Sequence, residues 1–159
     1  MYKHKLKLIE KGAKRLGIDI VETCLRDGAS ADKELPSADR ILCDVPCSGL
    51  GVLSRKPEIR YKDDLIDTDL ADIQYKILCE SAKYLKKGGK LVYSTCTLNP
   101  QENNKNTAKF LAEHNDFEGV ELELPPELKR AFDEKPYEIT LMPHTFDGDG
   151  FYIAVLTRR

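Results

Sequence analysis

The sequence predicts an α/β protein built around a parallel sheet. Apolar stretches of strand length, at 18–25, 38–45 and 90–96, alternate with stretches in which apolar residues recur at helical spacing. Reactive side chains follow the second and third of these strands directly. Because parallel α/β sheets bind ligands at the carboxyl ends of their strands, these positions predict a site there.

Composition narrows the class of protein. A length of 159 residues suffices for one domain with a hydrophobic core, and 41% apolar with 33% charged residues is typical of a soluble globular chain. No apolar run approaches the ~20 residues of a membrane-spanning helix. Five cysteines form no complete disulfide framework, so we expect free thiols in a reducing cytoplasm. A net charge of −2 does not indicate a nucleic-acid binder, although residues 1–17 and 54–62 are locally basic.

The first half of the chain predicts a helix and two strands. Apolar residues at helical spacing mark a helix that Gly17 ends. The strand at 18–25 follows, then a polar loop, and then the strand at 38–45. A loop of about 20 residues leads to a long amphipathic helix over 66–86. The glycine pair at 88 and 89 is predicted to cap that helix.

The second half predicts one more helix and three further strands after 90–96. Asn99, Pro100 and Glu102 match the N-cap, the first-turn proline and the carboxylate that reaches back in a helix extending to about His114. Strands are then predicted at 117–124, 138–143 and 151–158, the first two around a proline-rich turn with a short helix.

Two cysteine motifs carry the chemistry. LCDVPCSGLG at 42–51 places Asp44 and Cys47 just past one strand, and LVYSTCTLNP at 91–100 places Cys96 at the end of another. If the two strands are neighbours joined by the helix over 66–86 as a crossover, both thiols lie side by side at one edge of the sheet.

Three kinds of chemistry fit two thiols and a carboxylate. A zinc site is disfavoured, because Cys43 and Cys47 lack the usual short spacing and have no histidine nearby, so we predict no metal. A redox disulfide between Cys47 and Cys96 lacks a C-x-x-C motif. Covalent catalysis remains, in which a thiolate adds to position 6 of a pyrimidine and activates position 5 toward a methyl donor. A carboxylic group would stabilise the intermediate, and a second thiol would help to release it.

The motifs also carry a family resemblance. DVPCSGLGVLSRKPEIRY and YSTCTLNPQEN resemble the paired motifs of the RNA cytosine-5 methyltransferases, and among these the bacterial Sun (RsmB, Fmu) group, which modifies small-subunit ribosomal RNA. Residues 143–156 resemble the closing motif of the family, although Val155 stands where lysine is common. The resemblance covers essentially all 159 residues and implies a Rossmann-like, S-adenosylmethionine-dependent methyltransferase fold.

The resemblance assigns roles to individual residues. It implies that Cys96 is the nucleophile, that Cys47 assists product release, and that Asp44 contacts both the methyl donor and the base. Lys56 and Arg60 would contact the RNA backbone. The implied cofactor-binding positions are Asp27, Gly28, Asp44 and Pro46. By sequence alone Asp27 is equally well a turn residue, and Cys24, Cys43 and Cys79 are expected to be small buried hydrophobic residues.

Part of the family's pattern is missing from the sequence. The family's domain begins with a strand, a glycine-rich turn that holds the cofactor, and a second strand ending in an acid, and nothing here resembles them. We therefore expect residues 1–159 to be the carboxyl-terminal two-thirds of a catalytic domain, inactive alone. In the family's sheet these two strands lie between 18–25 and 38–45. Their absence would leave 38–45 with an apolar edge prone to self-association into homo-oligomers.

Two rival functions remain open. Amino-group methyltransferases favour Asn/Asp-Pro-Pro-aromatic where this chain has DVPC, and they need no thiol. A non-catalytic RNA-binding or assembly module could retain the same motifs as relics. Formation of a covalent adduct with RNA would distinguish the enzyme from the module.

Overall fold

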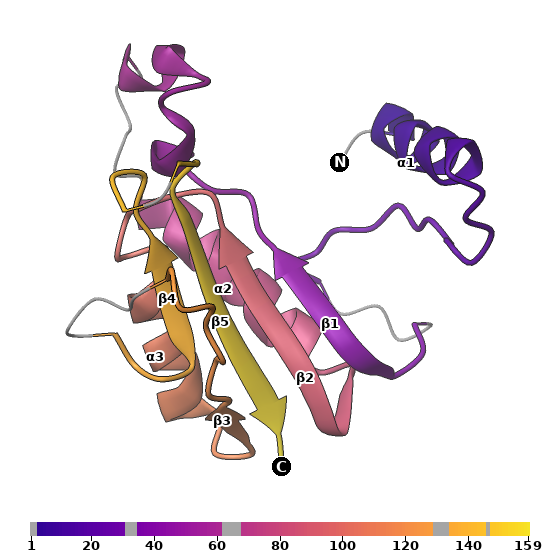
Figure 1. Ribbon diagram of the computed structural model, residues 1–159. Helices are drawn as coiled ribbons and strands as arrows, with labels where there is room; N and C mark the ends of the chain where they lie inside the picture. Colours follow the sequence, from indigo (N-terminus) through magenta and orange to yellow (C-terminus); the bar gives the residue numbers. More distant parts are fainter. Residues whose placement is uncertain (1–2, 31–34, 62–67, 129–133, 146) are drawn as a thin grey trace.

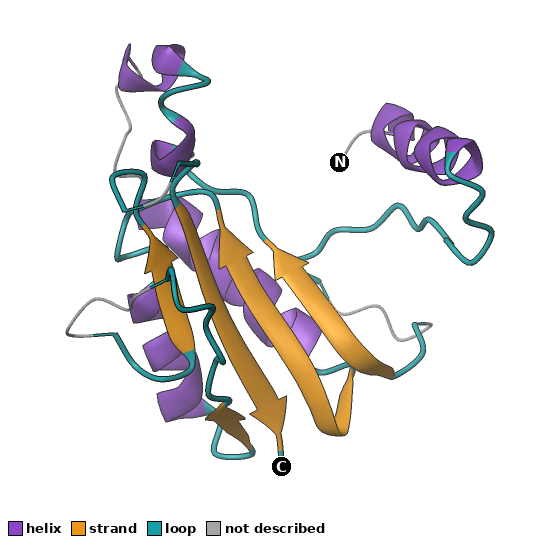
Figure 2. Ribbon diagram, viewed as in Figure 1, coloured by secondary structure: helices purple, strands orange, loops and turns teal. Residues whose placement is uncertain are grey.

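A computed structural model describes residues 3–30, 35–61, 68–128, 134–145 and 147–159. It contains a five-stranded mixed sheet with helices packed on one face (Figures 1 and 2). The helices are α1 (Lys3–Arg15), α2 (Thr68–Ala82) and α3 (Asn104–Glu113), with short 3-10 helices η1 (Leu50–Val52) and η2 (Pro57–Tyr61). The strands are β1 (Ala38–Asp44), β2 (Leu85–Thr95), β3 (Phe117–Gly119), β4 (Glu138–Leu141) and β5 (Phe151–Arg158).

The strand order β1-β2-β5-β3 confirms the predicted neighbours, and β4 pairs with β5 beyond that path. β1 and β2 are parallel and are joined by α2, which crosses the face of the sheet beside α3 (Figure 1). β5 is antiparallel to β2, β3 and β4. The parallel pair therefore places the carboxyl ends of β1 and β2 at the same edge of the sheet.

The core lies between the sheet and α2 and α3. Leu91 and Tyr93 of β2 are fully buried, as are Leu78 of α2 and Phe110 of α3. Burying each such side chain contributes roughly 1.5–3 kcal/mol relative to leaving it in water. The Tyr93 ring meets that of Tyr152 edge to face, with centroids 6.3 Å apart. This packing holds β2 in place in the sheet, and it therefore also fixes where the residues after β2 begin.

The predicted cap at the glycine pair is wrong. α2 ends at Ala82, and β2 already begins at Leu85. The ladder with β1 passes from Ala38↔Leu85 to Arg40↔Lys90, so residues 86–89 bulge out, with Gly88 at a φ of 73°. Pairing with Ala38 of β1 extends the strand to Leu85, and the Thr157 hydroxyl of β5 donates a hydrogen bond of 2.8 Å to the Gly89 carbonyl within the bulge.

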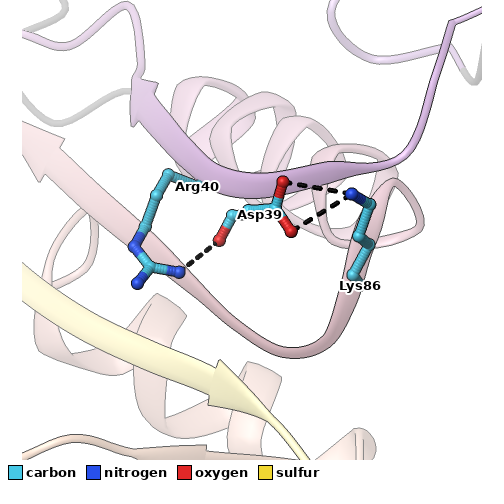
Figure 3. A network of polar contacts seen from close by, with 3 residues as sticks. All are labelled: Asp39, Arg40 and Lys86. Atoms are coloured by element: carbon cyan, nitrogen blue, oxygen red, sulfur yellow. Dashed lines mark hydrogen bonds and ion pairs between the residues drawn. The ribbon is translucent and has the colours of Figure 1, made fainter.

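An ion pair spans this bulge. The Lys86 ammonium lies 3.0 Å from the Asp39 carboxylate, and the Arg40 guanidinium donates a 2.7 Å hydrogen bond to the Asp39 carbonyl (Figure 3). Because both partners of the ion pair are largely exposed, it adds at most about 1 kcal/mol to stability.

The predicted strand at 18–25 is also wrong. These residues form no ladder, and Ile20 is 87% exposed. Within the described residues no strand lies beside them, and a strand requires ladder hydrogen bonds to a neighbour. The helix before them is confirmed, but α1 stands apart from the sheet in Figure 1 with Leu8 exposed. The outer edge of β1 has no partner strand in the described part of the chain either, and Leu42 is 72% exposed there.

Most of the remaining helices and strands are shorter than predicted. α3 begins after Asn103 rather than Asn99, because Asn99 caps the turn before it by accepting a 3.1 Å hydrogen bond from the Gln101 amide. β3 and β4 stop short of the predicted ends at 124 and 143, whereas β5 matches 151–158. Residues 66 and 67 of the predicted long helix, and 129–133 after the proline-rich turn, lie outside the described residues. None of the described helices is long and apolar enough to cross a membrane.

Candidate active site

The two predicted thiols meet at the edge of the sheet. Cys47 follows β1 and Cys96 follows β2, and their Sγ atoms lie 2.9 Å apart. The strands end level with each other because Asp44 pairs with Ser94 in the ladder. Both thiols are half-buried. The juxtaposition expected from the two motifs is therefore what the fold produces.

A close backbone approach holds the loop after Cys47 against Cys96. The Gly51 amide donates a 3.0 Å hydrogen bond to the Cys96 carbonyl, and the Gly150 amide donates a 2.7 Å bond to the Gly51 carbonyl. A Cβ atom at Gly51 would lie 2.0 Å from the Gly150 carbonyl oxygen, so a side chain is excluded at Gly51. The loop is thus pinned to both β2 and the segment before β5.

Burial sets the protonation of Cys47. Loss of solvent, followed by the hydrogen bond with Cys96, raises the pKa of the Cys47 thiol to about 12. Cys47 is therefore a neutral thiol at physiological pH, able to donate its S–H to the neighbouring sulfur. This arrangement suits a hydrogen-bond donor better than a primary nucleophile.

Asp44 and Pro46 lie at the same edge of the sheet. Asp44 is the last residue of β1, and its exposed carboxylate accepts a 3.1 Å hydrogen bond from the Ser94 hydroxyl. The Pro46 ring is exposed, and its carbonyl accepts a 2.8 Å hydrogen bond from the Gln74 amide of α2. The motif DVPC thus presents a carboxylate to solvent immediately before the half-buried thiol pair.

Asp27 and Gly28 do not join this group. The Asp27 carboxylate accepts a 3.0 Å hydrogen bond from the Ala29 amide, which is the turn role considered for this residue. Gly28 faces Ile77 of α2 and lines a cavity of about 420 Å³ with Ala38 and Tyr84. Ala38 begins β1 and Asp44 ends it, so this turn lies toward the amino end of the strand.

Glu102 is the functional candidate that the sequence missed. Its predicted capping role is wrong: the side chain is 1% exposed and its carboxylate accepts four hydrogen bonds of 2.6–3.0 Å. The donors are the Ser48 amide, the Ser48 hydroxyl, the Gln74 amide group and the Asn99 amide group. The spacing in LNPQEN is typical of a helix cap, and no local signal reveals that the carboxylate points toward residue 48.

The residues after the two cysteines are also paired. Ser48 follows Cys47 in the sequence and Thr97 follows Cys96, and the hydroxyl groups of Ser48 and Thr97 are 2.7 Å apart. Thr97 is fully buried, and its hydroxyl accepts a 3.2 Å hydrogen bond from the Asn99 amide. The loops therefore run side by side for at least two residues, which fixes their relative position.

The other cysteines divide between core and surface. Cys43 is buried as expected, and burial raises its pKa to about 11. Cys79 is half-buried. The prediction for Cys24 is wrong, because the segment that carries it packs against no strand and leaves the residue exposed. Among the described residues no group of three or more potential ligands is arranged to hold a metal ion.

The basic loop after Cys47 presents its cations outward. Lys56 and Arg60 are exposed, whereas Ile59 between them is buried and anchors η2 beneath Gly49. Arg55 is engaged with Asp149 at 3.0 Å. Lys56 and Arg60 are thus displayed on the segment that leads away from the thiols.

Comparison with known proteins identifies the family. The sequence model that describes the 16S rRNA methyltransferase RsmB/F family matches residues 1–157 of this chain. The chain belongs to this family. It is 41% identical over 165 aligned residues to a probable ribosomal RNA small subunit methyltransferase B of Bacillus subtilis, covering 100% of this chain and 36% of the relative.

Solved structures agree with this assignment. The chain is similar to NSun6 from Pyrococcus horikoshii with SFG (TM-score 0.84, 30% identity, 99% of this chain and 39% of that one). It is also similar to a methyltransferase homolog from the same organism (TM-score 0.79, 25% identity, 99% and 51%). The fold is thus Rossmann-like and of the S-adenosylmethionine-dependent methyltransferase type. The chain spans about a third of the length of curated relatives that it matches.

The raised pKa of Cys47 predicts its reactivity toward iodoacetamide. In the folded chain, alkylation of Cys47 should accelerate about tenfold per pH unit from pH 8 to pH 10 without levelling off, because only the thiolate reacts. In urea the same cysteine should level off above about pH 9, near its ordinary pKa. Mass spectrometry of the Cys47 peptide gives both profiles, and a plateau below pH 10 in the folded chain would contradict the assignment.

Proposed function

We propose that the protein carrying these residues methylates position 5 of cytosine in small-subunit ribosomal RNA, in a reducing cytoplasm that keeps its thiols free. The observation that carries the proposal is the 2.9 Å approach of Cys47 and Cys96 beside Asp44, at the sheet edge where this fold class binds its ligands. The chain's family and the name of its Bacillus subtilis relative support ribosomal RNA as the substrate.

The first half of the reaction belongs to Cys96 and Asp44. The Cys96 thiolate forms a bond to C6 of cytosine, and the electron pair of the C5–C6 double bond moves onto C5 and toward N3. Asp44 would contact the N3 edge of the base, and a proton shared between N3 and its carboxyl group would stabilise the negative charge that collects there. S-adenosylmethionine, when bound, supplies the methyl group that C5 takes up.

The second half of the reaction uses Cys47. After methyl transfer, a base removes the C5 proton, the C5–C6 double bond re-forms, and the bond between C6 and Cys96 breaks. The leaving sulfur carries a negative charge, and the neutral Cys47 thiol at 2.9 Å stabilises it by donating a hydrogen bond. The pKa of Cys47, raised to about 12 by burial, keeps this thiol protonated and therefore able to donate that hydrogen bond.

The residues that fit the cofactor are those at the site itself. Asp44 and Pro46 are exposed at the carboxyl end of β1, and an exposed carboxylate with open backbone suits a polar, positively charged sulfonium ligand. Use of this cofactor is supported by the family and by the NSun6 relative, whose ligand SFG is an analogue of S-adenosylmethionine. Asp27 and Gly28 would join the pocket only if their turn moved from the amino end of β1.

The two cysteines should respond differently to removal. In a chimera that carries residues 1–159 in place of the matching part of the Bacillus subtilis relative, Cys96→Ala should abolish methyl transfer to ribosomal RNA. Cys47→Ala should still permit attack but accumulate a protein–RNA adduct, because the leaving thiolate lacks the hydrogen-bond donor that stabilises it. Gel shifts under denaturing conditions measure the adduct, and Cys24→Ala, which is exposed and away from the site, is the matched control.

The same chimera separates the enzyme from a binding module. RNA containing 5-fluorocytosine has no C5 proton to lose, so an enzyme with intact Cys96 should be trapped on it covalently. A module with relic motifs would bind the RNA without forming any adduct. Methylation by Cys96→Ala, or an absence of adduct in both cysteine variants, would refute the assigned roles.

Residues 1–159 by themselves should bind S-adenosylmethionine weakly. The sequence holds no glycine-rich turn resembling the family's, and the Asp27 turn lies apart from Asp44. Losing several hydrogen bonds, at roughly 1–3 kcal/mol each, weakens a micromolar site by several orders of magnitude. Titration calorimetry should detect no micromolar binding to the chain and clear binding to the chimera. Micromolar binding to the chain alone would overturn this expectation.

The open edge of β1 should drive self-association. Its exposed Leu42 and unpaired backbone groups offer a template to another copy of the chain. Light scattering should therefore give a mass that exceeds 18.0 kDa and grows with concentration. Leu42→Lys should shift the mass toward the monomer, since a lysine blocks edge pairing. A clean monomer for the unaltered chain across a wide concentration range would contradict the prediction.

A further inference from the structure

We infer that Glu102 is the positioning residue that holds the Cys47 thiol against Cys96. The inference deepens the proposed function, on which its catalytic consequence rests, but the geometry can be tested without RNA or cofactor. It assigns Glu102 no contact with substrate: the carboxylate acts through the loop that carries Cys47.

Glu102 saturates its carboxylate with donors from three parts of the chain. One oxygen accepts from the Ser48 hydroxyl at 2.6 Å and from the Asn99 amide group at 3.0 Å. The other accepts from the Ser48 backbone amide at 2.9 Å and from the Gln74 amide group at 2.7 Å. An ionised carboxylate is an acceptor with two oxygens and room for about four donors, so this site matches its full capacity.

These bonds hold Cys47 from both sides. Ser48, which follows Cys47, gives both its amide and its hydroxyl to Glu102. Gln74 donates to the carbonyl of Pro46, which precedes Cys47, and to Glu102 as well. The Cys47 sulfur contacts the Cys96 sulfur and the backbone of Gly49 and Cys96. These contacts and the anchors of its two neighbours together set its position.

The segment that carries Glu102 is also bonded to β2 and to the residues that follow β2. The Glu102 carbonyl accepts a 2.7 Å hydrogen bond from the buried Tyr93 hydroxyl. The next residue, Asn103, accepts a 2.6 Å bond from the Thr95 hydroxyl and donates one of 2.9 Å to the Thr97 carbonyl. Cys96 lies between Thr95 and Thr97. Glu102 thus transmits the position of the segment that bears Cys96 to the loop that bears Cys47.

The chemistry requires a carboxylate rather than an amide. In Glu102→Gln one acceptor oxygen becomes an NH₂ group of nearly the same shape. On one side this group meets the Ser48 backbone amide, and on the other it meets the Asn99 amide group, so at least one of the four bonds becomes a donor–donor contact that the loop must move to relieve. Because this variant preserves volume, its effect isolates hydrogen bonding from packing.

The test is the bridging of the two thiols in the 159-residue chain by dibromobimane. Each thiolate displaces one bromide, and only thiols held close together are joined through one reagent molecule. We expect Glu102→Gln to lower the rate at which Cys47 and Cys96 are bridged by about tenfold or more, since displacement of about 1 Å is enough to cost such factors. Ser48→Ala, which removes one of the four bonds, should give a smaller decrease. Peptide mass spectrometry identifies the 47–96 bridge and separates it from alkylation at other cysteines.

The matched control is Glu138→Gln. Glu138 is also a buried glutamate, and it accepts a 2.6 Å hydrogen bond from Tyr152 in the same core, away from the thiols. It should lower the thermal midpoint as Glu102→Gln does but leave the bridging rate within about twofold of the parent chain. Rates are compared at temperatures where circular dichroism shows each variant folded.

The outcomes separate positioning from general stability. A bridging rate for folded Glu102→Gln within twofold of the parent, or an equal decrease in Glu138→Gln, would overturn the inference. If Glu102→Gln fails to fold, Ser48→Ala decides: a bridging rate equal to that of the parent overturns the inference, and a decrease supports it.

In the chimera, Glu102→Gln should accumulate the RNA adduct as Cys47→Ala does. An unaltered chimera that forms no adduct on 5-fluorocytosine RNA would refute the proposed function while leaving the bridging result intact.

Discussion

The parallel pairing of β1 and β2 is the constraint on which the rest of the site depends. The register that sets Asp44 opposite Ser94 ends both strands level, so the chain leaves the sheet twice at neighbouring points. The two loops then run together, sulfur beside sulfur and hydroxyl beside hydroxyl. A one-residue slip would turn every side chain of β1 to the other face and separate the thiols. The burial of Cys43 on β1 makes that slip costly.

Beneath the thiols lies a buried polar cluster rather than an apolar core. Gln74, Thr95, Thr97, Asn99, Glu102 and Asn103 are all buried. Such groups cost free energy unless they are bonded, and here they bond chiefly to one another. The side-chain oxygen of Gln74 has no hydrogen-bond partner, whereas its side-chain nitrogen donates to both Pro46 and Glu102. The two bonds to Pro46 and Glu102 therefore set the orientation of the amide group. The cluster contributes geometry, whereas stability comes from the apolar side chains below it.

The implied cofactor-binding positions fall into two places within the described residues. Asp44 and Pro46 stand at the site, but the Asp27 turn packs near the amino end of β1 against α2. The segment at 18–25 and the outer edge of β1 are both exposed and apolar, with Ile20 and Leu42 facing solvent. Exposed apolar chain beside an open sheet edge is a surface that binds further polypeptide.

The sequence by itself determined the elements whose signals are local and the meeting of the two thiols. Apolar runs mark β1, β2 and β5, and helical spacing marks α1, α2 and α3. The crossover rule then brings Cys47 and Cys96 together without further information. Tertiary structure decided everything that depends on a distant partner. The stretch 18–25 has strand composition but no neighbouring strand within the described residues. The glycine pair at 88 and 89 became a bulge because β1 pairs with β2 on both sides of it. Glu102 bonds to Ser48 and Gln74 instead of capping its helix. Local spacing constrains only residues within a turn or two, whereas a ladder bond or a buried carboxylate is stabilised by groups far away in the chain.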